Sequence, residues 1–430
     1  MRENTKVLDK VYDLISSVPL CPSCLGRAFA SLLRGYSNKE RGLALLRSLV
    51  MQLERGIEDG DEESREKLAK IASRLPPEFK ASLERKGIEY KGPEACWLCG
   101  GRINDWVNVY KKAANMLREL RADSFVVGVT LSKSLAQRED ELYRLHMITT
   151  GESIRQELKR EIGKRVTLET GIPVDFERPG VVVMVMIPQG IVYTMVNPLL
   201  ITGRYLKTGR NISQTQWVTR SGEKKFDLSV QTMLDPLRQI VGGTELVLHA
   251  SGREDTDARM LGNGRPMVVE VKEPQRRRLP LEVVEKVLNK GLKWGKVKLE
   301  RVATREVVRE IKTSDQHHRK AYRALIASDK DLDEKNVQEA AGKLRGVTIR
   351  QRTPRRVSHR RADIVREKKL HDIQLRLLTP RLLQAYFLAD GGLYIKELIS
   401  GDEGRTRPSL SETLGAGLRC VELDVIWVEE

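Results

Sequence analysis

The sequence predicts an α+β fold, with a mixed and mainly antiparallel β-sheet in the C-terminal half. Three observations carry this prediction. The first hundred residues place apolar side chains at helical spacing, and the middle of the chain reads as a helix followed by two strands. From about Leu228 onward, strands and helices alternate without a regular βαβ rhythm, which favours α+β over a doubly wound fold.

The helical N-terminal region rests on amphipathic segments. Glu40–Leu53 and Glu63–Leu75 carry apolar residues on one face with charged residues between them. Residues 106–120 repeat apolar side chains every three or four positions, which predicts one further helix. Phe125–Leu131 then reads as a strand.

The clearest local pattern follows in the middle of the chain. Thr149 and Glu152 have the spacing of a capping box, which predicts the start of a helix. Val181–Ile187 is apolar throughout, as expected for a strand buried on both faces. A Pro-Gln-Gly turn leads into a second strand, Ile191–Asn197. Together these elements predict a small α/β unit.

Length and charge narrow the class of protein. A chain of 430 residues predicts two or three domains, and we expect regions 1–104, 105–220 and 221–430. Lys and Arg total 76 against 59 acidic residues, a formal net charge of +17. This excess predicts a polyanionic partner, either nucleic acid or an anionic membrane, while a generally charged surface is the alternative. We expect a cytosolic, non-membrane protein, because no stretch resembles a membrane span or signal peptide.

Four of the five cysteines form two CxxC pairs, Cys21 with Cys24 and Cys96 with Cys99. A CxxC turn aims two thiolates at one ion, and two such turns complete a tetrahedral structural zinc site. The 71 residues between the pairs exceed ordinary spacing, so a helical insertion must return the chain to its start. A redox dithiol or unrelated buried cysteines are the alternatives. Cys420, in an apolar stretch, is expected to be a buried core thiol.

The segment Ser251–Glu270 combines two glycine–arginine pairs with two aspartates and few apolar residues. Its glycines would let the backbone approach a phosphate, and its arginines would supply forked donors. Asp255 beside Arg253 would be held ionised and could then act as a nucleophile or base. A salt-bridged surface loop is the alternative.

Three other segments are notable for their charge. Gly203–Trp217 is basic and reads as a loop. Lys343–Lys369 holds eleven basic and two acidic residues, and predicts extended strands joined by a loop. Tyr394–Leu398 alternates like a strand and carries Lys396 between apolar neighbours. That lysine would either be buried beside a carboxylate or lie exposed on an edge strand.

Several segments in this order resemble the THUMP-containing tRNA pseudouridine synthases of the Pus-ten family. The resemblance covers most of the chain. It is carried by the two CxxC pairs, GRYLKTGRNISQTQW at 203–217, SGREDTDARMLGNGRP at 251–266, KAYRALI at 320–326, QRTPRRVSHRRAD at 351–363 and YIKELISGDEGRTRPSL at 394–410.

The resemblance implies a zinc-binding N-terminal region, a THUMP-like RNA-binding region and a pseudouridine synthase catalytic domain. It implies Asp255 as the catalytic carboxylate, with Asp257 as the nearer rival. Tyr322 matches the tyrosine that stacks on the target base and is a candidate proton acceptor. Lys396 matches the basic residue that pairs with the catalytic carboxylate.

Substrate contacts are expected from a further set of residues. Leu398 would help to wall the base pocket, and Arg405 is a candidate contact for a phosphate or carboxylate. We assign phosphate tracking to Gly203–Lys207 with Arg210 and to Arg350–Arg361. The full substrate-binding set comprises Arg253, Tyr394, Leu398, Arg405, Arg204, Tyr205 and Arg210.

The expected reaction is therefore the isomerisation of uridine to pseudouridine in the T-arm of tRNA, at uridine 55 and also uridine 54. The expected cofactor is structural zinc, without an organic cofactor, and the enzyme is expected to be a monomer. A non-catalytic RNA-binding or RNA-processing factor with the same fold is the main alternative. A THUMP-bearing methyltransferase or thiolase would need a glycine-rich or P-loop-like nucleotide site, which the sequence does not display.

Overall fold

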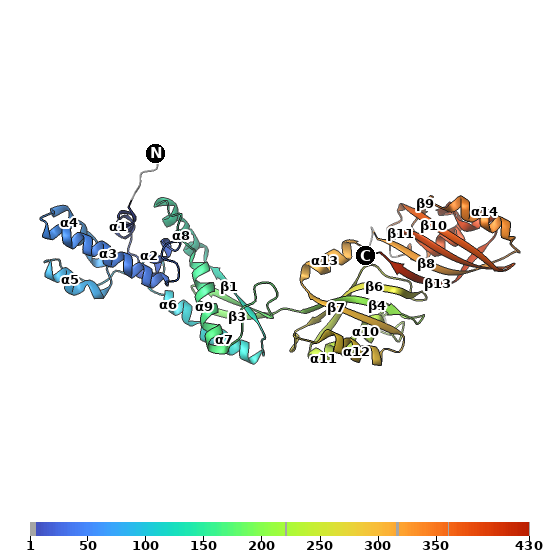
Figure 1. The fold of residues 1–430 in the computed structure, drawn as a ribbon, viewed down its shortest axis with the longest axis horizontal. Helices are drawn as coiled ribbons and strands as arrows, with labels where there is room; N and C mark the ends of the chain where they lie inside the picture. Colours follow the sequence, from blue (N-terminus) through green and yellow to red (C-terminus); the bar gives the residue numbers. More distant parts are fainter. Residues whose placement is uncertain (1–5, 220–221, 315–317, 360, 430) are drawn as a thin grey trace. The chain divides into compact units, whose positions relative to one another are not determined.

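The computed structural model describes residues 6–219, 222–314, 318–359 and 361–429. It forms two compact units, Met1–Asn197 and Pro198–Glu430, here called unit 1 and unit 2 (Figure 1). The expected boundary at residue 220 therefore falls inside unit 2. The expected boundary at residue 104 falls inside unit 1, where one hydrophobic core runs from the N-terminal helices into the small sheet.

The N-terminal part of unit 1 is helical, as the apolar spacing predicts. α3 begins with a capping box formed by Ser37 and Glu40, so it starts before the predicted Glu40. The helices are α1 (Val7–Ser17), α2 (Pro22–Ala28), α3 (Asn38–Glu58), α4 (Glu62–Ile71) and α5 (Lys80–Arg85).

The rest of unit 1 is a small α/β layer. Its elements are α6 (Ile103–Asn108), α7 (Tyr110–Glu119), β1 (Phe125–Leu131), α8 (Lys133–Leu145), α9 (Ile154–Thr170), β2 (Val181–Ile187) and β3 (Ile191–Val196). The helix expected over residues 106–120 is divided between α6 and α7, which meet at Val109. The capping box of α9 is Ser153 with Gln156 rather than Thr149 with Glu152. Glu152 instead accepts a hydrogen bond from Asn38 at 2.7 Å, so a tertiary contact takes the predicted capping side chain.

The three-stranded sheet of unit 1 has the order β1-β2-β3, with β1 and β2 parallel and β2 and β3 antiparallel. α7 and α9 pack on one of its faces (Figure 1). The expectation that β2 is buried on both faces is wrong. Val183 and Val185 are fully buried, whereas Met186 on the other face is 36% exposed, because the helices cover only one side.

Unit 2 is built on a large mixed sheet. The described strands pair in the order β12-β9-β10-β11-β8-β13-β6-β4-β7, with β5 on β6, and every pair is antiparallel except β13 with β6. The strands are β4 (Leu199–Lys207), β5 (Glu245–Ala250), β6 (Arg259–Lys272), β7 (Gly295–Ala303), β8 (Arg319–Ser328), β9 (Thr348–Arg352), β10 (Val365–Thr379), β11 (Leu382–Asp390), β12 (Thr406–Arg407) and β13 (Leu418–Val428). This arrangement confirms the predicted α+β class with a mainly antiparallel sheet.

Helices cover the two halves of the sheet. α10 (Val230–Met233), α11 (Asp235–Val241) and α12 (Leu281–Gly291) lie against the half that contains β4, β6 and β7 (Figure 1). The remaining helices are α13 (Arg305–Ser314), α14 (Glu334–Leu344), α15 (Ile395–Ser400) and α16 (Leu410–Leu414), with the short 3₁₀ turn η3 (Arg355–Val357). Because β6 and β13 join the two halves of the sheet, loops that end at this junction are brought together from distant parts of the sequence.

Two segments differ from the sequence predictions. Gly203–Lys207 is the end of strand β4, not a loop. A Cβ on Gly203 would lie 2.2 Å from the Lys298 carbonyl oxygen, so glycine allows β4 and β7 to approach each other. Residues 395–400 form helix α15 rather than a strand, since Leu398 and Ile399 turn into the core with Ile395 at helical spacing.

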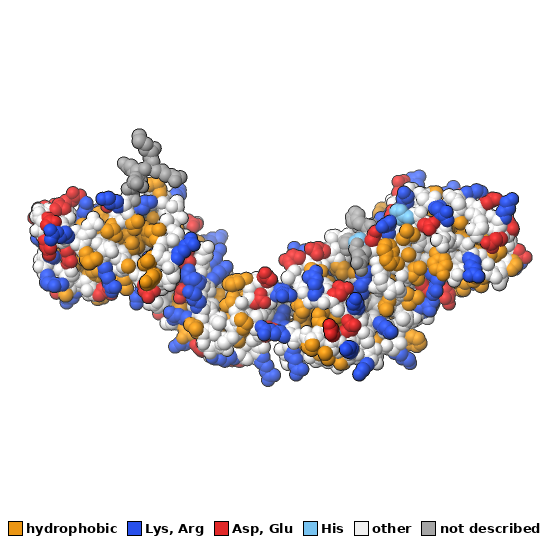
Figure 2. All heavy atoms as spheres, in the orientation of Figure 1, with side chains coloured by type: hydrophobic (Ala, Val, Ile, Leu, Met, Phe, Trp, Pro, Cys, Tyr) orange, Lys and Arg blue, Asp and Glu red, His pale blue; other side chains and the backbone are white. Residues whose placement is uncertain are grey.

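The surface mixes charges of both signs, with Lys and Arg beside Asp and Glu on the visible face of each unit (Figure 2). None of the helices in the described part of the chain combines the length and apolar character that a bilayer crossing requires.

Candidate active site and metal centre

A cleft of about 1630 Å³ opens in unit 2 beside the junction of β6 and β13. Its basic lining comprises Lys225, Arg253, Arg265, Lys320, Arg356, Arg361, Arg366, Lys368 and Lys396, and its aromatic lining Trp217, Phe226, Tyr322 and Tyr394. The acidic side chains that reach it are Glu254, Asp255, Asp257 and Glu367. A cleft with cationic and aromatic walls suits a nucleic-acid strand with unstacked bases.

The loop between β5 and β6 places Asp255 in this cleft. Gly252 starts the loop with a φ of +70°, a conformation that disfavours other residues. The Arg356 Nη1 donates to Asp255 Oδ1 at 2.9 Å, and Lys396 Nζ lies 3.4 Å from Asp255 Oδ2. The Asp255 side chain is 35% exposed, so it is both accessible from the cleft and flanked by two cations.

The two cations determine the charge state of Asp255. Burial acts to raise the pKa of this carboxyl, but the positive charges of Arg356 and Lys396 outweigh burial and lower the pKa below the ordinary aspartate value. Asp255 is therefore ionised at neutral pH. An ionised carboxylate in a partly desolvated cleft can act as a nucleophile or as a base.

Lys396 contacts both candidate carboxylates. Its Nζ donates to the Asp257 oxygens at 2.8 and 2.7 Å, closer than its 3.4 Å approach to Asp255. The Asp257 side chain is 56% exposed and lies more openly than Asp255. Lys396 thus bridges the two aspartates, and its pair with Asp255 is shared rather than exclusive.

Arg356 is the site residue that the sequence interpretation missed as a partner of Asp255. Its Nε donates to Glu397 Oε1 at 2.6 Å, and the Glu397 side chain is almost fully buried. Burial acts to lower the pKa of Arg356, but Glu397 and Asp255 raise it overall, so Arg356 remains a cation. The neighbouring Arg355 pairs with Glu403 instead, and nothing in the run of arginines distinguishes the two. In the sequence, the one signal that a further cation belongs to this site is Glu397, the acidic residue next to Lys396.

Two tyrosines line the same cleft. Tyr322 lies on β8 opposite Val425 of β13 and is 8% exposed. Tyr394 immediately precedes α15, and its hydroxyl accepts a hydrogen bond from Arg361 Nη1 at 2.6 Å. The guanidinium groups of Arg356 and Arg361 each lie 5.8 Å from the Tyr394 ring. Tyr394 therefore contacts two arginines of the cleft wall, and Tyr322 lines the same cleft as Asp255.

Arg204 and Tyr205, which the sequence analysis assigned to substrate contacts, both bind groups of the protein itself. Tyr205 is fully buried in the core, and its hydroxyl donates to the Glu254 carboxylate at 3.1 Å. Arg204 Nε donates to the carbonyl oxygen of Asn263 at 2.8 Å. β4 lies between β6 and β7, and both side chains contact protein groups, which does not favour the expected phosphate role of Gly203–Lys207.

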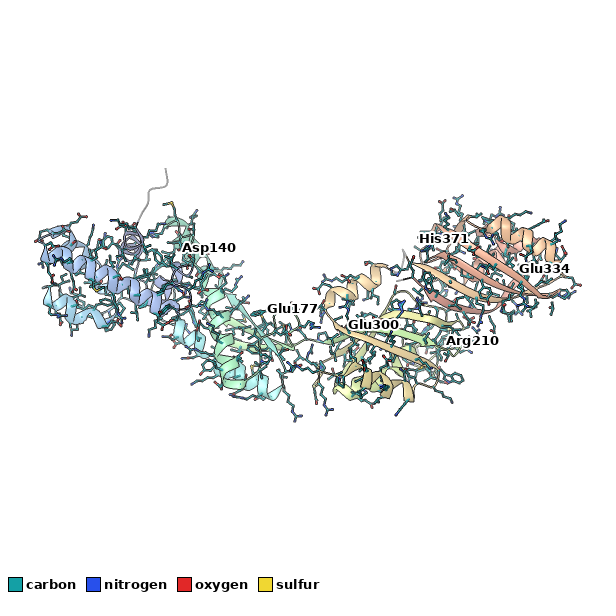
Figure 3. All side chains as sticks on the ribbon, in the orientation of Figure 1. Asp140, Glu177, Arg210, Glu300, Glu334 and His371 are labelled. Carbon is teal, nitrogen blue, oxygen red and sulfur yellow. The ribbon has the colours of Figure 1, made fainter. Side chains whose placement is uncertain are left out.

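Arg210 is also occupied by protein groups (labelled in Figure 3). Its Nη1 donates to the carbonyl oxygens of Asp257 at 2.8 Å and Leu423 at 2.9 Å. Its Nη2 pairs with Asp424, a nearly buried carboxylate, at 2.9 Å. Arg210 therefore holds the loop that carries Asp257 through its contacts with protein groups.

The other expected substrate contacts divide into two kinds. Arg253 is exposed and lines the cleft, and among the described residues it has no ion-pair partner. Arg405 donates to the Thr353 carbonyl oxygen at 2.7 Å and to Asp363 at 2.6 Å, so it holds the loop that carries Arg356. Leu398 is fully buried in the core and does not line the cleft, because α15 turns it inward. Arg360, within the expected phosphate segment, lies outside the described residues.

The glycines after the aspartates serve strand packing rather than phosphate contact. Gly262 has a φ of +61°, and a Cβ there would lie 1.7 Å from the Ile426 carbonyl oxygen. Glycine thus lets β6 approach β13, at the junction that forms the cleft.

Unit 1 contains a candidate metal centre. The Sγ atoms of Cys21, Cys24, Cys96 and Cys99 all lie within 4.8 Å of one another, and those of Cys21 and Cys99 are 3.6 Å apart. Tetrahedral zinc with bonds of about 2.3 Å places sulfurs about 3.8 Å apart, so the four residues fit a metal ion. The helical insertion α3–α5 returns the chain to its start, as the spacing requires.

Cys420 differs from the expected core thiol. It is only partly buried, and its Sγ donates to the Glu422 carbonyl oxygen at 3.4 Å. Burial raises the pKa of this thiol to about 11, so it is not a nucleophile at neutral pH.

Comparison with known proteins places the chain in a family. The model described as Pus10, C-terminal, matches residues 200–429, which is more than half of the chain. The chain belongs to the Pus10 family. A second model, the archaeal Pus10 THUMP domain, matches residues 109–185. The predicted family resemblance and the presence of a THUMP domain are thereby confirmed.

Curated relatives extend this match over nearly the whole chain. The tRNA pseudouridine synthase Pus10 of Aeropyrum pernix is 43% identical over 99% of this chain and 98% of that protein. The protein of the same name from Ignisphaera aggregans is 37% identical over 99% of both chains. That from Pyrococcus furiosus is 34% identical over 98% of both.

Proposed function

We propose that this chain isomerises uridine to pseudouridine in tRNA, with Asp255 as the catalytic carboxylate. As a member of the Pus10 family the chain is an isomerase, and relatives 33–43% identical are named tRNA pseudouridine synthase. The observation that carries the residue assignment is the ionised Asp255, held between Arg356 and Lys396 in a cleft lined by Tyr322.

The reaction needs one carboxylate and a site that confines the detached uracil. The bond between C1′ and N1 of uridine breaks, the uracil rotates, and a bond forms between C1′ and C5. The proton on C5 is lost and N1 gains one, so no electrons are transferred and no organic cofactor is required. Asp255 starts the reaction either by attacking C1′ or by a glycal route, and each route uses its ionised form.

Tyr322 is proposed to stack on the target base and to act as a candidate proton acceptor. Aromatic stacking on a base contributes about 1–3 kcal/mol. The target uridine must leave its own stack to reach Asp255, since the carboxylate lies inside the cleft. The family assignment favours the T-arm, with uridine 55 and also uridine 54 as targets.

The phosphate contacts are proposed to come from the arginine side of the cleft. Arg253, Arg361 and Arg366 line it together with Lys225. Neutralising phosphates releases counterions, so tRNA affinity should fall as salt rises. These residues replace the β4 segment that the sequence interpretation had favoured.

The metal centre of unit 1 is proposed to hold structural zinc through Cys21, Cys24, Cys96 and Cys99. Four protein ligands leave no open position, so this ion would stabilise the fold and take no part in the isomerisation. We expect about one zinc per chain by elemental analysis and a lower Tm for unit 1 after chelation. Purified protein that lacks zinc and keeps its Tm in chelator would contradict this.

Product mapping tests the proposed function. Purified protein is incubated with an unmodified tRNA transcript without any cofactor, and pseudouridine is mapped to single nucleotides. We expect product in the T-arm from the wild type and none from Asp255→Ala, with tRNA affinity retained. A non-catalytic RNA-binding factor would bind the transcript and yield no product from either protein.

A further inference from the structure

The loop between β5 and β6, residues 251–258, is here called the catalytic loop because it carries Asp255. Hydrogen bonds to its backbone hold this loop in place. Five of its carbonyl oxygens, those of residues 251, 252, 255, 256 and 257, accept hydrogen bonds from side chains of β4, β6 and the segment between β4 and α10. The donor and acceptor pairs are Arg265 to Ser251 at 2.7 Å, Gln214 to Gly252 at 2.9 Å, Lys207 to Asp255 at 3.1 Å and to Thr256 at 3.3 Å, and Arg210 to Asp257 at 2.8 Å.

Lys207 is at the centre of this arrangement. It is fully buried at the end of β4, and its Nζ donates to the carbonyl oxygens of Ile212, Asp255 and Thr256 at 2.9, 3.1 and 3.3 Å. Its three donors therefore link the end of one strand to the two peptide groups at the catalytic carboxylate. Lys207 does not line the cleft, so it cannot contact the substrate.

A buried carboxylate balances the charge of Lys207. Glu254 Oε1 lies 3.5 Å from Lys207 Nζ, and its side chain is 1% exposed. Arg265 Nε donates to Glu254 Oε2 at 2.8 Å, and the Tyr205 hydroxyl donates to the same carboxylate. Burial acts to raise the pKa of Glu254, but Arg265 and Lys207 lower it overall, so the carboxylate is ionised. Glu254 and Asp255 are adjacent in sequence, yet the Glu254 side chain is 1% exposed and the Asp255 side chain 35% exposed.

We propose that Lys207 is a positioning residue for the isomerisation, which fixes the backbone of Asp255 and Thr256 so that the Asp255 carboxylate is held at the reacting sugar. This inference rests on the proposed catalytic role of Asp255. Arg356 of η3 and Lys396 of α15 contact the Asp255 carboxylate and fix its side chain, but they do not fix its backbone. A displacement of about 1 Å in a reacting group can reduce a rate about 100-fold.

The test compares kcat with KM for Lys207→Met, which keeps a chain of similar length without donors. We expect kcat to fall about 10- to 100-fold, because the carboxylate is no longer held in place. KM for tRNA should stay within about twofold, because no cleft-lining group is removed. A kcat equal to that of the wild type in a folded variant would overturn the proposal.

A further variant separates positioning from a simple loss of stability. Leu344→Ala removes a buried side chain of α14 in the same unit, away from the cleft, and should lower Tm without lowering kcat. Lys207→Met leaves Glu254 paired with Arg265 at 2.8 Å, so it creates no unpaired buried carboxylate. A Leu344→Ala variant that loses as much kcat as Lys207→Met at a similar Tm would mean that lost stability, rather than the hold on the carbonyl groups, explains the effect.

Arg210→Met keeps the proposal testable if Lys207→Met does not fold. It removes the donor to the Asp257 carbonyl oxygen, while Arg259 and Arg323 remain on Asp424 at 2.8 Å. A fall in kcat of about threefold or more at constant KM supports the loop-holding account, and an unchanged kcat opposes it.

Asp255→Ala, assayed in parallel, separates the proposed function from the proposed role of Lys207. Activity in Asp255→Ala overturns the proposed function, whereas an inactive Asp255→Ala with a fully active Lys207→Met overturns only the role of Lys207.

Discussion

Two segments of unit 2 are similarly basic in sequence but have different roles in the structure. In the first segment, residues 203–214, Lys207 and Arg210 donate to backbone carbonyl oxygens of the catalytic loop. The arginine loop, residues 350–361, brings Arg356 to the Asp255 side chain and Arg361 to the cleft wall. The difference comes from burial. Lys207 is fully buried at the end of β4, whereas the Arg356 side chain lies in the loop that follows β9 and is 37% exposed.

This contrast shows why charge alone does not identify a nucleic-acid contact. A buried cation requires carbonyl or carboxylate partners, and Lys207 and Arg210 find them in the loop that carries both aspartates. A cation at the rim of a cleft keeps free donors for a phosphate. The two roles predict different effects of mutation, one on kcat and the other on affinity.

The largest expected effect within the arginine loop is that of Arg356→Gln. We expect kcat to fall about 10- to 100-fold, because Asp255 loses its 2.9 Å donor and the buried Glu397 carboxylate loses its cation. Arg355→Gln is the matched control, since Arg355 is exposed and pairs with Glu403. Single-turnover rates measure both. Equal losses in the two variants would contradict the distinction between these neighbouring arginines.

The same variant should change the pH dependence. In the wild type the pKa of Asp255 is lowered, so kcat should hold until the pH falls below about 4, the ordinary range of an aspartate. The contribution of this ion pair to stability is likewise present above the unfolded-state pKa and lost as pH falls through the lower folded-state pKa. Without Arg356, less positive charge opposes the effect of burial, so the pKa of Asp255 should rise. The acid limb of kcat should therefore move to higher pH. A limb that stays in place would show that Arg356 does not set the charge of Asp255.

A smaller effect is expected on tRNA affinity. Arg361→Gln should weaken binding several-fold and reduce the slope of log affinity against log salt by about 1, as for one lost phosphate contact. Arg204→Gln should leave both quantities unchanged, because Arg204 donates to the Asn263 carbonyl oxygen. Titrations at several salt concentrations measure this. A reduced salt slope in Arg204→Gln would return the β4 segment to the RNA interface.

Much of the fold follows from local patterns in the sequence. Long amphipathic helices such as α3 and the apolar strands β1, β2 and β3 were predicted because their periodicity extends over several residues. α15 was not, because five residues around Lys396 satisfy both a strand and a helix pattern. β4 was missed since its glycine, lysine and arginine resemble a loop until β6 and β7 pair with it.

Site residues could be predicted from the sequence where a distinctive segment contains few candidates of the required residue type. Asp255, Tyr322 and Lys396 come from three distant segments, and the structure brings them to one cleft. Arg356 could not be singled out, because its partner Glu397 becomes adjacent only after folding. Arg204 and Arg210 were assigned to RNA because the sequence does not show which cations will bind carbonyl or carboxylate groups of the protein itself.

The most direct test is a comparison of Asp255→Asn with Asp257→Asn. Each change removes one negative charge at nearly constant shape, and both carboxylates contact Lys396. Pseudouridine formed in a single turnover is measured at saturating enzyme. The account predicts no product from Asp255→Asn and substantial product from Asp257→Asn, and the reverse pattern would contradict it.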